Sequence, residues 1–113
     1  MTTEIGVTFD CADPKVMATY WAQALGYVEE GTDAEYAAII DSEGKRPRIL
    51  FLRVPEPKVV KNRVHLDLHV ADMQVEVERL LTLGGKRLRM EEDEDGDVWT
   101  VMADPEDNEF CVA

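Results

Sequence analysis

The sequence predicts an α+β fold made of two tandem modules, each with the order strand, helix, strand, strand, strand. The first observation behind this prediction is a repeat. Residues 5–26 and residues 64–84 each run from an alternating strand through an aspartate and a helical pattern to a Leu-Gly pair. The second is spacing, because the two aspartates lie 59 positions apart and the two Leu-Gly pairs lie 58 apart. The third is that each half then leads through a charged turn into a last apolar strand.

The repeat also sets the expected domain organisation. We expect a single domain over residues 1–113, with one internal module at residues 1–54 and a second at residues 62–113. Residues 55–61, which contain two prolines, form the expected linker between them. A mass of 12.8 kDa fits one compact domain of this kind.

Both predicted helices carry start and stop signals. Asp13 suits the N-cap, Pro14 suits the first helical position, and Gly26 can take the left-handed conformation that ends a helix. Asp72 and Gly84 have the same places in the second half. Each helix also repeats apolar residues at helical spacing, which predicts one buried stripe: Met17, Tyr20, Trp21 and Ala24 in the first helix, and Met73, Val77, Leu80 and Leu81 in the second.

The first strand of each module, expected over residues 5–11 and residues 64–70, alternates between an apolar and a polar face. The polar faces consist of Gly6, Thr8 and Asp10 in the first strand and of His65, Asp67 and His69 in the second. Because the apolar faces should pack on the helices, the polar faces become the lining of the sheets. This arrangement predicts a curved, open cup with the two helices on its outside.

Charge and hydropathy exclude several classes of protein. The 24 acidic and 12 basic residues give a net charge of −12, which opposes binding to nucleic acid or to an anionic membrane. No apolar run approaches the roughly 18 residues of a membrane-spanning helix, and no signal peptide is expected at the N-terminus. Two cysteines do not make a disulfide framework. We therefore expect a soluble, acidic, cytoplasmic protein.

Several stretches together resemble a known superfamily. They are the helix region from Asp13 to Gly26, the strand Val64-His65-Leu66-Asp67-Leu68, and the segment from Asp104 to Phe110. With this order and spacing the chain resembles the vicinal oxygen chelate superfamily of glyoxalases, ring-cleaving dioxygenases and bleomycin resistance proteins. The residues from Val54 to Lys58, from Lys61 to Asp67 and from Glu109 to Val112 are similar to a glyoxalase-like subgroup. The resemblance implies one eight-stranded cup formed by both modules, with a ligand site inside.

The resemblance also implies where a metal ion would be held. Metalloenzymes of the superfamily bind one divalent ion through the first and last strands of both modules, usually with His and Glu or Gln. Here His65 matches, whereas Gly6 and Cys111 stand at two of the other positions and the fourth falls within Ile49–Leu52. We therefore expect no standard metal site and no cofactor. The alternative is Zn, Ni, Mn or Fe bound by His65 with help from Cys111, Asp67 or His69.

The expected function is binding of a small organic molecule, cationic or polar-neutral, in the cup. The expected ligand-binding residues are Thr8, Asp10, His65, Asp67, His69, Trp99 and Cys111. The alternative is a lyase, isomerase or dioxygenase that uses an atypical metal set, or His65 and Asp67 as a catalytic acid–base pair. A homodimer also fits, because half-barrels leave sheet edges open.

Overall fold

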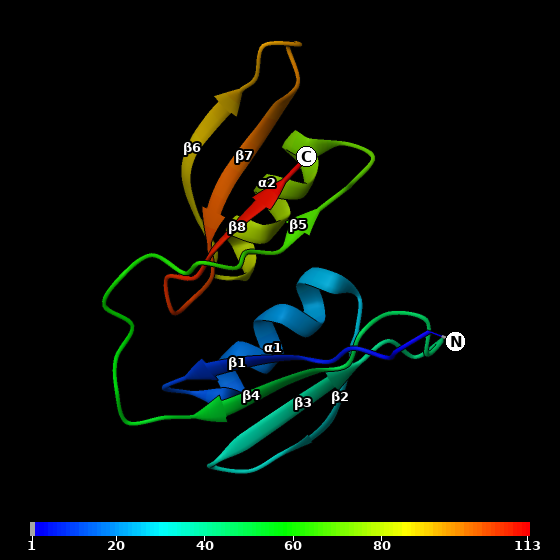
Figure 1. The fold of residues 1–113 in the computed structure, drawn as a ribbon, viewed down its shortest axis with the longest axis vertical. Helices are drawn as coiled ribbons and strands as arrows, with labels where there is room; N and C mark the ends of the chain where they lie inside the picture. Colours follow the sequence, from blue (N-terminus) through cyan, green and yellow to red (C-terminus); the bar gives the residue numbers. More distant parts are fainter. Residues whose placement is uncertain (1) are drawn as a thin grey trace. The chain divides into compact units, whose positions relative to one another are not determined.

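The computed structural model describes residues 2–113 and separates into two compact units, the first ending at Pro57 and the second spanning Lys58–Ala113. Each unit is a βαβββ module with one helix packed on one four-stranded sheet (Figure 1). The fold class predicted from the sequence, α+β with two tandem βαβββ modules, is confirmed. The closure of both sheets into one cup stays a prediction. Neither described helix is long and apolar enough to cross a membrane.

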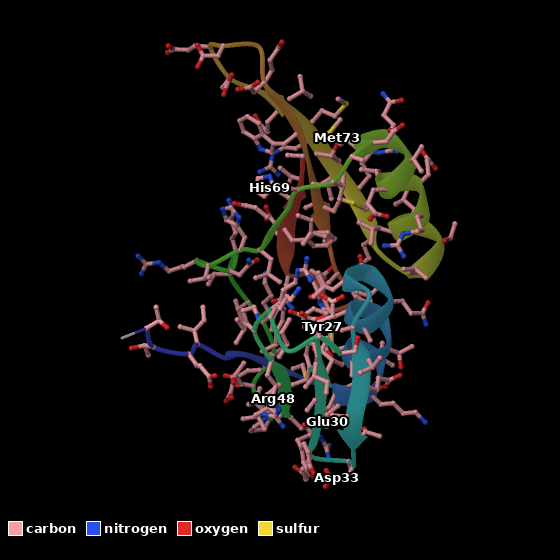
Figure 2. The ribbon with its side chains drawn as sticks, turned by 90° about the vertical axis from the view of Figure 1, so that its right-hand side faces the viewer. Tyr27, Glu30, Asp33, Arg48, His69 and Met73 are labelled. Carbon is pink, nitrogen blue, oxygen red and sulfur yellow. The ribbon has the colours of Figure 1, made fainter. Side chains whose placement is uncertain are left out.

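The first unit has the sheet order β1-β4-β3-β2, in which β1 and β4 are parallel and the other pairs antiparallel. Its elements are β1 (Val7–Cys11), α1 (Pro14–Leu25), β2 (Val28–Thr32), β3 (Tyr36–Ile40) and β4 (Ile49–Arg53). The Tyr27 hydroxyl donates to the Pro47 carbonyl at 2.8 Å, and Arg48 pairs with Glu30 at 3.1 Å (Figure 2). These contacts tie the connection before β4 to the region of β2.

The second unit repeats this topology with the order β5-β8-β7-β6. Its elements are β5 (Asp67–Leu68), α2 (Met73–Leu83), β6 (Lys86–Glu92), β7 (Val98–Ala103) and β8 (Glu109–Val112). The repeat extends to irregularities, because a bulge between Glu29 and Gly31 in β2 has its counterpart between Arg87 and Arg89 in β6. Corresponding positions of the two sheets can therefore be compared.

The helix ends are as the sequence predicts. Asp13 accepts a hydrogen bond from the Val16 amide at 3.2 Å, and Asp72 accepts one from the Val75 amide at 3.2 Å. Gly26 and Gly84 end the two helices in the left-handed region, where a side chain would be strained.

Each unit has its own apolar core between helix and sheet. In the first unit the Phe9 ring lies 5.7 Å from Trp21 and 5.2 Å from Phe51, measured between centroids. Cys11 is buried in the same unit, as expected for a small core residue. The largest fully buried apolar side chains of the second unit come from α2, β7 and β8: Val77, Leu80, Met102, Phe110 and Val112.

Two strand predictions were too long. Ile5 precedes β1 and is 68% exposed, so it does not belong to the apolar face. The strand expected over residues 64–70 is regular only at Asp67–Leu68, and Val64 is 83% exposed. The physical reason is at Asn62, whose side chain, rather than the Val64 backbone, bonds the Glu109 amide.

Candidate functional site

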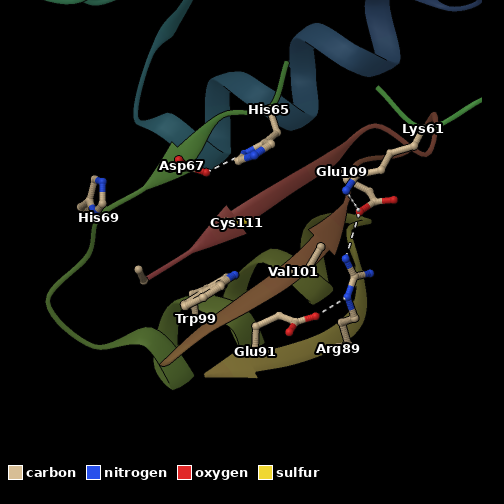
Figure 3. A pocket seen from close by; sticks show the side chains of 11 residues that line it. Lys61, His65, Asp67, His69, Arg89, Glu91, Trp99, Val101, Glu109 and Cys111 are labelled. Carbon is tan, nitrogen blue, oxygen red and sulfur yellow. Dashed lines mark hydrogen bonds and ion pairs between the residues drawn. The ribbon is translucent and has the colours of Figure 1, made fainter. Parts of the chain in front are cut away.

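The sheet of the second unit carries a cavity of about 480 Å³ on the face opposite α2 (Figure 3). Its lining side chains come from all four strands and from the chain on either side of β5. They are Lys61, His65, Asp67, His69, Arg89, Glu91, Trp99, Val101, Glu109, Cys111 and Ala113.

Strand register explains why these residues share a face. Asp67 pairs with Cys111, Cys111 with Val101, and Val101 with Arg89, so one row crosses the four strands. Directly paired residues project to the same side of a sheet. Residues two positions away along the chain join the same face and account for the rest of the lining except Lys61, which precedes β5.

One end of the pocket is a hydrogen-bonded cluster around Asp67. His65 Nδ1 lies 2.7 Å from Asp67 Oδ1. An ionised carboxylate only accepts, so Nδ1 carries the hydrogen and Nε2 keeps a lone pair in the neutral ring. No described residue bonds Nε2. The imidazole can therefore act through Nε2 as a base or as a hydrogen-bond acceptor.

The same carboxylate acts on Cys111. Burial, and after it the charge and hydrogen bonding of Asp67, raise the pKa of the Cys111 thiol. The thiol consequently stays protonated at neutral pH. A protonated thiol is a weak nucleophile and a poor metal ligand, so this cysteine is not prepared for covalent catalysis.

The other end of the pocket is an ion-pair network. Arg89 Nε donates to Glu91 at 2.7 Å, and its Nη2 lies 3.6 Å from Glu109 Oε1. Lys61 Nζ lies 3.9 Å from the same oxygen. Hydrogen bonding to Glu91, with the nearby carboxylates, raises the pKa of Arg89. Both cations are thus already paired with carboxylates.

Glu109 is the least satisfied member of this network. Its side chain is 19% exposed, and no described residue donates a hydrogen bond to Oε1, although two cations lie nearby. A buried carboxylate oxygen without a donor is costly. A donor on a bound molecule, or a water, would satisfy it.

The lining also has an apolar part, which comes from β7. Val101 is buried and Trp99 is half-buried, and both project from β7 into the pocket (Figure 3). The Trp99 ring offers a flat surface on which a planar or cationic group can stack.

The structure brings five of the seven expected ligand residues together here: His65, Asp67, His69, Trp99 and Cys111. Thr8 and Asp10 are exposed on β1 of the first unit and do not line this pocket. Four charged lining residues were not expected from the sequence: Lys61, Arg89, Glu91 and Glu109. For Glu109 the available signal was period two, since it precedes the expected site residue Cys111 by two positions, whereas no such signal pointed to Arg89 and Glu91.

Two of the positions that the resemblance assigns to metal ligands, in the first unit, carry no donor side chain. In the first unit Thr8 pairs with Leu50, and in the second unit the corresponding pair is Asp67 and Cys111. Leu50 is therefore the first-unit counterpart of Cys111, and its side chain has no donor atom. A Cβ on Gly6 would meet only the Arg48 carbonyl at 3.7 Å, so this backbone does not demand glycine, and yet no donor stands there.

A smaller set of donors does exist in the second unit. One ligand atom each from His65, Asp67 and Cys111 lies within 4.8 Å of the others. The raised pKa of the Cys111 thiol disfavours metal binding by this set, because a cysteine binds a metal as the thiolate.

A comparison with known protein families identifies the family of this chain. A family model described as "Glyoxalase-like domain" matches residues 6–113, nearly the whole length. The protein therefore belongs to the glyoxalase-like domain family, within the vicinal oxygen chelate superfamily that the sequence motifs resemble. A comparison with curated protein sequences gave no significant match.

Solved structures agree on the fold. A glyoxalase/bleomycin resistance protein/dioxygenase family enzyme from Burkholderia phytofirmans PsJN has a TM-score of 0.75 at 17% identity, covering 94% of this chain and 93% of that one. The E126Q mutant of the fosfomycin resistance protein FosX from Listeria monocytogenes, complexed with Mn(II) and 1S,2S-dihydroxypropylphosphonic acid, has a TM-score of 0.79 at 12% identity, covering 99% and 90%. The bleomycin-binding protein from Streptomyces verticillus, complexed with copper(II)-bleomycin, has a TM-score of 0.66 at 17% identity, covering 100% and 98%.

Proposed function

We propose that this protein binds a small organic molecule on the polar face of its second sheet, without the standard divalent metal. The observation that carries the proposal is the pocket of about 480 Å³, with an apolar part and paired charges in its lining. Such a cavity has the volume and the mixed lining of small-molecule sites. Gly6 and Leu50 support the metal-free part, because neither offers an atom to an ion.

The charge of the lining favours a cationic or polar-neutral ligand. Three carboxylates and two cations line the pocket, which leaves one net negative charge when both histidines are neutral. Both cations are paired already, so an anionic ligand would have to displace a carboxylate. A cation can instead rest on Trp99 with carboxylates nearby.

The fold supports this class of function only because other proteins with the same fold are known to bind small molecules. The Streptomyces protein named above is a bleomycin-binding protein, and the FosX structure holds a phosphonic acid together with Mn(II). Proteins of this fold thus include an organic-molecule binder and a metal-containing resistance protein. The donor set of this chain is the reason for choosing the first class.

The test compares two planar fluorescent probes of opposite charge in the presence of EDTA. We expect 9-aminoacridine, a cation, to bind with 1:1 stoichiometry, and 1-anilinonaphthalene-8-sulfonate, an anion, to bind at least tenfold more weakly. Trp99→Ala should weaken the cation by about tenfold, equivalent to about 1.4 kcal/mol of stacking and burial. Tyr36→Ala, which removes an exposed aromatic ring of the first unit, is the matched control.

Two results would overturn the proposal. One is tighter binding of the anionic probe. The other is a stoichiometric divalent ion in protein purified without chelator, measured by elemental analysis, that is lost in His65→Ala.

A second candidate function is acid–base catalysis by His65, and one observation favours it. The 2.7 Å bond to Asp67 engages Nδ1, so Nε2 of this pocket-lining histidine is left as the candidate base. We propose proton abstraction next to a carbonyl as the reaction class. The check is exchange of α-protons of bound ketones in D₂O followed by NMR, which His65→Gln should abolish. Exchange at an unchanged rate in that variant would rule out the role of His65.

We further propose a cytoplasmic protein that forms a homodimer. The dimer is supported by the outer strands of each sheet, such as β2 and β6, which can offer backbone groups to a second copy. Sedimentation equilibrium at micromolar concentration checks the dimer. A monomer mass of 12.8 kDa throughout would contradict it.

A further inference from the structure

The ladder between β5 and β8 has an unusual rung next to the pocket. The Cys111 amide donates to the Leu66 carbonyl at 2.9 Å, as in an ordinary parallel pair. In a regular parallel ladder, the Glu109 amide, two residues before Cys111, would donate to the carbonyl of Val64, two residues before Leu66. It donates instead to the side-chain oxygen of Asn62, at 2.7 Å.

The Asn62 amide completes this substitution with its nitrogen. Nδ2 donates to the Val64 carbonyl at 2.9 Å and to the Glu109 carbonyl at 2.9 Å. Two carbonyl partners and one N–H partner fit only one orientation of an amide, so the assignment of its oxygen and nitrogen is unambiguous. The side chain therefore lies between two main chains that would otherwise bond directly, and Val64 is held outward, 83% exposed.

We propose that Asn62 is a positioning residue that sets the spacing between His65 and Glu109 on the two strands that border the pocket. The proposal rests on the ligand-binding function proposed above. Direct bonding would bring the strands to the ordinary spacing of about 4.8 Å at this point, whereas an inserted amide keeps them further apart. Both His65 and Glu109 line the cavity. His65 directly follows Val64, and Glu109 is bonded to Asn62 through its backbone.

Neighbouring contacts give this amide further influence. Lys61, the preceding residue, lines the pocket and pairs with Glu109 at 3.9 Å. Asn62 thus fixes the backbone on both sides of the least satisfied carboxylate. Its position also explains why the regular strand starts only at Asp67.

The three hydrogen bonds of the Asn62 side chain require asparagine at this position. Aspartate keeps the acceptor for the Glu109 amide but places lone pairs against two carbonyl oxygens. Glutamine is one methylene longer, and alanine offers no polar atom. Asn62→Asp is therefore the nearly isosteric variant and Asn62→Ala the full deletion.

The experiment measures two properties of the full-length protein. The first is the affinity for 9-aminoacridine, and the second is the set of imidazole ¹⁵N shifts of the only two histidines, His65 and His69. We expect both Asn62 variants to bind the probe at least tenfold more weakly and to shift the His65 nitrogens while those of His69 stay in place. Asn108→Ala is the matched control, because Asn108 bonds Asp104 through its amide and does not line the pocket.

The outcomes separate this proposal from the proposed function. A merely structural role predicts a lower melting temperature with unchanged His65 shifts, as expected for Asn108→Ala, and this result would overturn the proposal. If the wild-type protein does not bind the probe, the ligand proposal fails while the His65 shifts still decide the role of Asn62. If Asn62→Ala does not fold, Asn62→Asp gives the same readout.

Discussion

At the residue scale, Asp67 makes two contacts with opposite chemical consequences. Its bond to His65 Nδ1 leaves Nε2 of the neutral ring with a lone pair, whereas its charge and hydrogen bonding add to burial in raising the pKa of the Cys111 thiol. One carboxylate thereby orients the imidazole and disfavours the thiolate. The pocket is suited to reversible binding or proton transfer rather than to a covalent thiol intermediate.

The thiol provides a direct test of this assignment. Asp67→Asn removes the negative charge that helps to raise the pKa of Cys111, so the thiolate fraction at pH 8 should increase. We expect the native protein to react with 5,5′-dithiobis(2-nitrobenzoate) at least several-fold faster in this variant. Cys111→Ser should remove the reaction, since Cys11 is buried. An unchanged reaction rate in Asp67→Asn would show that Asp67 does not contribute to the raised pKa of Cys111.

At the element scale, the connection between β3 and β4 is organised by Asp41. Its carboxylate accepts hydrogen bonds from the backbone amides of Glu43, Lys45 and Arg46 at 3.0–3.2 Å. The Glu43 amide bond is the largest cause of a lowered pKa at Asp41, with smaller contributions from the other two amides and the Arg46 charge. A lowered pKa means that the folded state favours the ionised form.

The pH dependence follows from that direction. Stabilisation by ionised Asp41 is complete above the unfolded carboxyl pKa of about 4 and disappears as the pH falls through the lower folded value. Asp41→Asn should therefore lower the melting temperature at pH 7, and the difference from wild type should vanish toward pH 2. Calorimetry from pH 2 to pH 7 checks this. Glu43→Gln, which alters only an exposed pair with Lys45, should show no such convergence.

Elements could be predicted from the sequence where the signals were local. Helix ends were predictable because caps act within a turn, as at Asp13 and Asp72. The start of β5 was not, because the Asn62 amide acts on Glu109 across 47 positions. In β6 the bulge between Arg87 and Arg89 interrupts simple alternation, so the lining role of Arg89 required the register. The His65, Asp67 and His69 face was predictable because its alternation is unbroken.

At the scale of the whole molecule, the two modules share a topology but differ in the polar side chains on their sheets. The row Asp67–Cys111–Val101 in the second sheet corresponds to Thr8–Leu50–Ala38 in the first. The topology and even the bulges are retained, while the polar donors are concentrated in one unit. The two modules therefore differ in the side chains on this face and not in their backbone topology, and the proposed binding site rests on those side chains.

The overall charge adds a kinetic prediction at this same scale. A net charge of −12 surrounds a pocket with one net negative charge, so long-range attraction should accelerate the arrival of a cation. Raising the salt concentration from about 0.01 M to about 1 M shortens the Debye length from about 30 Å to about 3 Å. We expect the association rate of 9-aminoacridine, measured by stopped-flow fluorescence, to fall several-fold over this range, while its dissociation rate changes less. Unprotonated acridine at pH 8 is the neutral control, and an equal salt dependence for both probes would show that charge does not guide the ligand to this pocket.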